Sequence, residues 1–138
     1  MHSMVLAGAV IRLTPRLHVL ISVANAFKKI VPFMWLYRLF AWILMPKKTH
    51  ETSRSLFVQE AKKIKQKEFL RWLTLTGDIA KYLIKINEKE SDVPCLYIMG
   101  EEDYVFLEPV KRLVKQFRNT ELSILPDSGH VCNVDQYQ

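Results

Sequence analysis

The stretches CLYIMGEED, residues 95–103, and LSILPDSGH, residues 122–130, decide the fold of this sequence. Each starts with a short apolar run of strand length and ends in a turn followed by polar side chains. A continuous apolar run closed by glycine is typical of a parallel strand covered on both faces, which we expect for residues 95–99. Between the two runs, apolar positions recur at helical spacing from Val110 to Phe117. The order strand, helix, strand predicts a crossover unit of an α/β sheet.

The preceding part of the sequence is predicted to be mainly helical. A short apolar run at residues 4–8 has the pattern of one further buried strand. Thr14 and Pro15 then form a helix start, a capping hydroxyl followed by proline at the first helical position. Apolar residues repeat at helical spacing from there to Ile86, and Gly77 is expected to break the last helical stretch.

Composition and charge narrow the class of protein. The 138 residues carry a formal net charge of +6, with 49% hydrophobic and 25% charged residues, as in one globular domain. Lysines between residues 47 and 67 alternate with glutamates, which favours a solvated helix face over a nucleic-acid patch. The most apolar stretch, residues 30–45, contains Arg38 and would span about 24 Å as a helix, short of the ~30 Å hydrocarbon core. We therefore predict no nucleic-acid partner and a buried or interfacial helix, with a membrane surface as the less favoured partner.

Cysteines and histidines predict neither a disulfide nor a metal site. Cys95 and Cys132 show no pairing pattern, and the first thirty residues lack the order of a signal peptide, so we expect a cytoplasmic protein with free thiols. His2, His18 and His50 lack metal-ligand spacing, and no metal or other cofactor is predicted.

Two polar residues follow the ends of the last two predicted strands. Asp103 lies four residues past Met99, and His130 lies five past Leu125. Adjacent parallel strands bring such loops together, and a carboxylate beside an imidazole fixes its tautomer and stabilises the imidazolium. The alternative is a capping or solvated aspartate and a structural histidine, which the spacing alone does not exclude.

The segments Gly100-Glu101-Glu102-Asp103 and Asp127-Ser128-Gly129-His130, each after an apolar strand, resemble the acid and base segments of α/β-hydrolases. In that family the triad follows the chain order nucleophile, acid, base, and the spacing of 27 residues between Asp103 and His130 fits one helix plus one strand. The resemblance implies an α/β fold, the C-terminal part of an α/β-hydrolase, with few parallel strands and a large helical cap insertion. Its parts would be residues 1–10, a core strand; residues 11–90, the helical cap region; and residues 91–138, a C-terminal core segment with the acid and base loops.

The sequence departs from the family at the nucleophile. A nucleophile elbow needs Gly-x-Ser-x-Gly, and no two of the four glycines are four residues apart. The elbow also supplies an oxyanion-hole donor, whose contribution in such enzymes is about 3–4 kcal/mol. Ser128 is expected to bond its local backbone, and Cys132, two residues from His130, is a poor substitute nucleophile. The resemblance thus implies a fragment of a serine-type hydrolase of esters, thioesters or related acyl compounds that is inactive alone.

Further expectations concern the apolar side chains. Trp35, Phe40 and Trp42 either line an apolar pocket for a small acyl or ester-like substrate or simply pack within the cap. The alternative function is a noncatalytic binding or assembly module whose apolar helices engage a membrane surface or a protein partner. The strand at residues 4–8 would have an exposed edge, which predicts a homo-oligomer formed by edge pairing or by exchange of the apolar helices between Pro15 and Met45.

Overall fold

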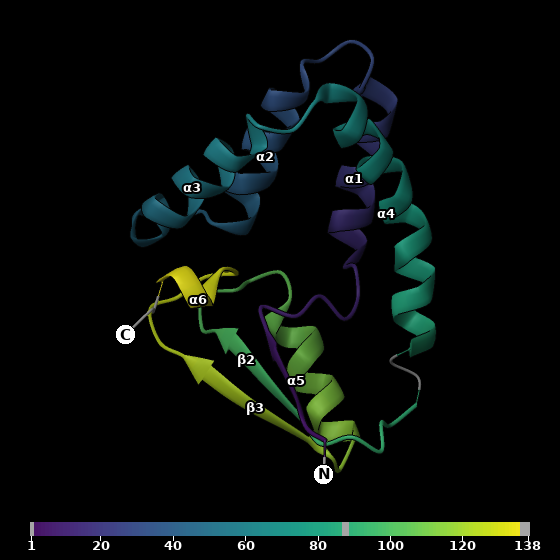
Figure 1. Cartoon of the computed structure of the whole chain (residues 1–138), viewed down its shortest axis with the longest axis vertical. Coiled ribbons are helices and arrows are strands. Elements are labelled where there is room, and N and C mark those ends of the chain that lie inside the picture. The colour runs from purple at the N-terminus through teal and green to yellow at the C-terminus, as the bar shows by residue number, and fades with distance from the viewer. Residues whose placement is uncertain (1, 87–88, 136–138) are drawn as a thin grey trace.

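A computed structural model describes residues 2–86 and 89–135 (Figure 1). Three strands, β1 (Met4–Ala7), β2 (Cys95–Gly100) and β3 (Thr120–Leu125), form a parallel sheet in the order β1-β2-β3. The helix α5 (Leu107–Gln116) joins β2 to β3 and packs on one face of the sheet. The predicted order strand, helix, strand and the α/β fold class are confirmed.

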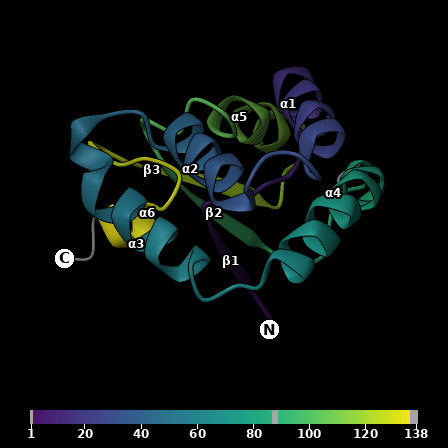
Figure 2. The ribbon, with the colours of Figure 1, turned by 90° about the horizontal axis from the view of Figure 1, so that it is seen from above.

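The remaining helices lie mainly above and beside the carboxyl ends of the strands (Figures 1 and 2). The helices α2 and α3 lie over those ends, and α1 and α4 run side by side. None of the helices in the described ranges is both long and apolar enough to cross a membrane. The bounds are α1 (Pro15–Phe27), α2 (Phe33–Leu44), the 3₁₀ helix η1 (Lys48–His50), α3 (Glu51–Ala61), α4 (Gln66–Ile86) and α6 (Cys132–Asp135).

The start of α1 follows from its sequence. The Thr14 hydroxyl accepts a hydrogen bond from the Leu17 N–H at 3.4 Å, and Pro15 occupies the first turn, where a missing N–H costs nothing. Leu17, Ile21 and Ala24 lie on one face and are buried. Their burial attaches α1 to the core that α5 and β2 share.

The predicted break at Gly77 is wrong. The helix α4 runs through Gly77 without interruption, and the helical stretch is divided instead at residues 62–65, between α3 and α4. Gly77 is exposed, and a helical glycine costs only about 1 kcal/mol relative to alanine. A helix of 21 residues with a buried apolar face tolerates that cost.

The predicted burial of β1 and of both faces of β2 is also wrong. Along β2, the side chains of Cys95, Tyr97 and Met99 are buried against the α5 side, whereas Leu96 and Ile98 are only partly buried. Val5 of β1 is 60% exposed and lies in register with Leu96. The apolar run predicted the strand correctly, but it cannot tell how many layers cover a sheet.

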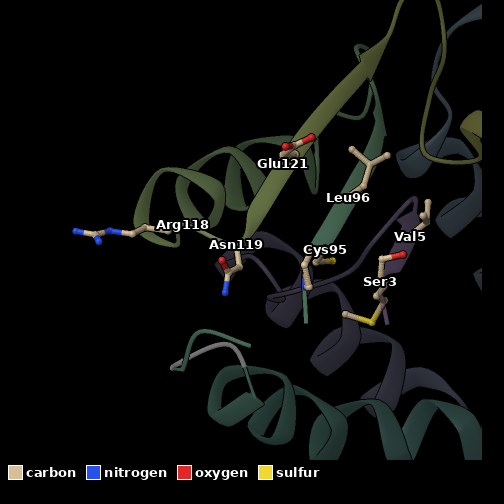
Figure 3. Close-up of a pocket in the computed structure, with 9 residues that line it drawn as sticks. Ser3, Val5, Cys95, Leu96, Arg118, Asn119 and Glu121 are labelled. Carbon is tan, nitrogen blue, oxygen red and sulfur yellow. The ribbon is translucent and has the colours of Figure 1, made fainter. Parts of the chain in front are cut away.

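The less covered part of the sheet carries a hollow at the amino ends of the strands (Figure 3). Its volume is about 410 Å³, and its lining includes Val5, Leu96 and Glu121, which are in register across the three strands. Because Asp103 and His130 follow the carboxyl ends, this hollow lies at the opposite end of the strands from them.

Because the surface of β1 is exposed, we predict that the 138-residue chain associates with itself. An apolar edge strand with exposed side chains pairs readily with another copy, and exchange of the apolar helices between Pro15 and Met45 is the other mode that we propose. Analytical ultracentrifugation at micromolar concentration is expected to show a dimer or higher oligomer. A compact, stable monomer would contradict the prediction.

The mode of association can be tested with a matched pair of variants. Val5→Lys places a charge on the exposed face of β1 and is expected to weaken association through the strand. Val19→Lys changes an equally exposed valine on α1 and leaves the strand edge intact. If only Val19→Lys dissociates the oligomer, helix exchange rather than strand pairing joins the copies.

Candidate functional site

The acid loop after β2 holds Asp103 in a fixed orientation. The Asp103 side chain is 1% exposed, and its Oδ1 accepts the backbone N–H groups of Val105 at 3.2 Å and Phe106 at 2.9 Å. These donors directly precede α5, whose amino end favours a carboxylate. The other oxygen, Oδ2, is thereby directed to His130.

The base loop, residues 126–131, brings His130 to this carboxylate. Nδ1 of His130 lies 2.8 Å from Oδ2 of Asp103, and the Phe106 ring packs 4.8 Å from the imidazole, centroid to centroid. Since a carboxylate accepts, Nδ1 carries the proton and Nε2 is left with the lone pair. The His130 side chain is 17% exposed. The prediction that Asp103 and His130 approach within hydrogen-bonding or one-water distance is confirmed.

The local geometry of the base loop also bears on Ser128. Asp127 adopts a left-handed backbone conformation, φ 51°, which aspartate tolerates better than most residues. The Ser128 hydroxyl is buried and donates to the carbonyl of Leu125 at 2.9 Å. It bonds its local backbone, as expected, and takes no part in the pair between Asp103 and His130.

Two of the four glycines, Gly8 and Gly100, lie against the base loop, and Gly129 is part of it. A Cβ at Gly8, where φ is +59°, would lie 2.6 Å from the carbonyl oxygen of His130, and a Cβ at Gly100 would overlap the carbonyl oxygens of Ser128 and Gly129. A Cβ at Gly129 would lie 2.9 Å from the His50 ring. The loop therefore packs backbone against backbone at Gly8 and Gly100, and against the His50 ring at Gly129, which is possible only without side chains at these positions. Sequence reasoning used the glycines to exclude an elbow and missed this role.

A second histidine and carboxylate lie beside the first pair. Nε2 of His50 is 2.8 Å from Oε2 of Glu102, and the other oxygen of Glu102 pairs with Lys47. The hydrogen bond from Lys47 holds the pKa of the Glu102 carboxyl below its usual range, and the charge of Lys47 adds to this against the opposing effect of desolvation. Spacing alone contains no signal for this cluster, because His50 and Glu102 meet only through tertiary packing.

The other candidate residues are placed differently. Trp35 and Trp42 lie exposed on α2, whereas Phe40 is partly buried against the core. Cys132 is buried, its Sγ lies 3.7 Å from the carbonyl oxygen of Ile98, and burial raises the pKa of its thiol. A raised thiol pKa disfavours the nucleophilic thiolate. Over the described residues, no group of three side chains could hold a metal ion.

No family model matches the sequence, and no curated protein matches it. Among solved structures, the chain is similar to MGS-M2, an α/β hydrolase enzyme from a Medee basin deep-sea metagenome library, with a TM-score of 0.66 over 96% of the chain. The fold is that of part of an α/β hydrolase. The two sequences are 20% identical, so the likeness concerns the fold, and the chain spans 50% of the length of MGS-M2.

The packing of the glycines predicts unequal effects of the same substitution at two positions. Gly100→Ala forces β2 and the base loop apart and is expected to destabilise the fold by about 1–3 kcal/mol or more. Gly77→Ala, on an exposed helical surface with no atom within 4 Å, is expected to stabilise it by up to about 1 kcal/mol. Urea unfolding followed by circular dichroism measures both. Equal free energies of unfolding for the two variants would contradict the close packing at Gly100.

The lowered pKa of Glu102 predicts a pH dependence of stability. A carboxyl whose pKa is lowered on folding stabilises the protein above its ordinary value of 4.5, and this contribution is lost as the pH falls through the lower folded pKa. Glu102→Gln should therefore lower the urea midpoint at pH 7 and have progressively less effect in acid. Glu60→Gln removes an exposed carboxylate paired with Lys63 and serves as control, with a small effect at either pH. A deficit of Glu102→Gln that grows in acid would contradict the assigned direction.

Proposed function

We propose that this chain contributes the acid and the base of a Ser-His-Asp hydrolase that cleaves ester, thioester or related acyl bonds. The observation that carries the proposal is the 2.8 Å contact between Oδ2 of Asp103 and Nδ1 of His130. It lies at the carboxyl ends of two adjacent parallel strands, where ligand chemistry in open α/β sheets takes place. The α/β-hydrolase fold of the chain supports the same assignment.

The chemistry follows from the two side chains. Nε2 of His130 takes the proton of the nucleophile as it attacks the acyl carbon and later returns a proton to the leaving group. Asp103 keeps the imidazole in the correct tautomer and stabilises the imidazolium. The 138 residues contain no Gly-x-Ser-x-Gly, so we propose that nucleophile and oxyanion donors are supplied by polypeptide outside this sequence.

A small acyl or ester-like compound is the substrate that we propose. The helix α2 lies over the carboxyl ends of the strands, and its apolar side chains would shield an acyl group from water (Figure 1). Trp35, Phe40 and Trp42 are proposed to contribute to this apolar surface. Two of them are exposed in the chain described here, which leaves them accessible to a ligand.

The chain by itself is predicted to be inactive. An acid and a base without nucleophile and oxyanion hole leave little rate enhancement, so we expect no turnover of short p-nitrophenyl esters and no labelling by a fluorophosphonate probe. Mass spectrometry of the labelled chain checks the second point. Stoichiometric labelling of a serine would show that the chain carries its own nucleophile.

The function itself is tested by joining the chain to the polypeptide encoded immediately upstream of Met1, read in frame or across a frameshift. An upstream Gly-x-Ser-x-Gly and esterase activity of the joined protein are expected. In that protein, His130→Ala and Asp103→Asn should lower kcat by about 10³–10⁴. His18→Ala, at an exposed histidine of α1, is the control and should retain activity. An upstream sequence without an elbow, or activity independent of His130, would refute the proposal.

A noncatalytic module is the second candidate, and the exposed apolar side chains of α4 favour it. Trp72, Leu75, Ile79, Tyr82 and Ile86 are all exposed and repeat every three or four residues, so they share one face of the helix. Flotation with phosphatidylcholine vesicles, with and without phosphatidylserine, tests membrane binding. Robust binding without esterase activity in the joined protein favours this function; absence of binding eliminates its membrane form.

A further inference from the structure

Two consecutive carboxylates at the end of β2 each contact a histidine from a different segment of the chain. Asp103 holds His130 of the base loop, and Glu102 contacts His50, which comes from η1 in the helical region. The His50 side chain is 0% exposed and cannot meet a substrate. The proposed function uses the first pair and leaves the second without a role.

The ring of His50 packs against the backbone of the base loop. A Cβ at Gly129 would lie 2.9 Å from Cε1 and 3.1 Å from both ring nitrogens, so the imidazole occupies the space that a side chain at position 129 would need. Gly129 directly precedes His130. The position of the His50 ring therefore limits how far the base loop can move toward η1.

Hydrogen bonding within the fold does not account for this histidine. In the part of the chain that the structure describes, neither ring nitrogen makes an aligned hydrogen bond, although Nε2 lies at ion-pair distance from Glu102. Buried polar atoms are nearly always paired, so a buried imidazole of this kind calls for a specific reason. A phenylalanine or leucine would fill the same space without that cost.

The surroundings of His50 are anchored to both loops. Glu102 pairs with Lys47 on one side, and its backbone N–H donates to the carbonyl of Ser128 at 2.8 Å on the other. Three residues after His50, Ser53 donates to Asp135, whose second oxygen accepts the Gly129 N–H at 2.7 Å. The segment that carries His50 is thus connected to the base loop through Glu102, which bonds Ser128, and through Asp135, which bonds Gly129.

We propose that His50 is a positioning residue. Together with Glu102 it holds Gly129 in place, so that His130 meets Asp103, and it couples the helical region to the acid and base. The inference rests on the proposed function for the catalytic meaning of His130. The hydrogen bond between His130 and Asp103, which the inference concerns, can be observed without any catalytic activity.

The test uses nuclear magnetic resonance of the full chain with ¹⁵N-labelled histidine. An Nδ1 proton hydrogen-bonded to a buried carboxylate gives a downfield signal in slow exchange, which is assigned to His130 by its loss in His130→Gln. In His50→Ala we expect this signal to broaden or disappear while the far-ultraviolet circular dichroism is retained. His18→Ala, at an exposed histidine, should leave it unchanged.

Two further variants keep the test decisive if His50→Ala fails to fold. Gly129→Ala adds one methyl group against the His50 ring and should displace the base loop, with loss of the His130 signal. His50→Phe keeps a ring against Gly129 but loses the contact with Glu102, and should weaken the signal less than His50→Ala does. The proposal is overturned if a folded His50→Ala or Gly129→Ala chain keeps the wild-type signal, if a folded His50→Phe chain keeps it unchanged, or if the wild-type chain lacks it.

An intact His130 signal combined with an inactive joined protein would refute the proposed function and leave the positioning role standing. Loss of the positioning effect with full activity would do the reverse. The two proposals therefore fail separately.

Discussion

The close packing of the base loop against the end of β2 is the constraint on which the rest of this site depends. At Gly100 the strand comes so near to Ser128 and Gly129 that no side chain fits between them. This close packing brings His130 to within hydrogen-bonding distance of Asp103. It also orients the loop for its hydrogen bonds, such as that from the Glu102 N–H to the Ser128 carbonyl. Polar groups in such a crowded place are satisfied only in one arrangement, which makes the loop rigid.

Parallel strand order explains why acid and base meet. Adjacent parallel strands end at the same edge of a sheet, so the residues that follow β2 and β3 become neighbours although 27 positions separate Asp103 from His130. The helix α5 closes the crossover, and the N–H groups of Val105 and Phe106, just before it, donate to Asp103. The supersecondary unit of residues 95–130 therefore builds the pair, and the remainder of the chain forms its surroundings.

The sequence predicted the part of the site that depends on local pattern. The strands, α5 and the meeting of Asp103 with His130 follow from apolar runs and short loops, which are properties of neighbouring residues. Other features depend on which surfaces meet in three dimensions. They are the cluster of His50 with Glu102, the burial of only one face of β2, and the continuity of α4 through Gly77. A single sequence does not show directly which surfaces come into contact.

The contacts of residues 47–53 with the base loop limit how such a protein can change over evolution. The helical region can change by replacement as a block or by single substitutions. Here the block includes Lys47, His50 and Ser53, which contact the loops of the acid and the base directly or through Asp135. If Asp103 and His130 act as proposed, replacing residues 47–53 by a segment without these three side chains would alter the surroundings of the pair, whereas substitutions within α1, α2 and α4 would leave these contacts intact.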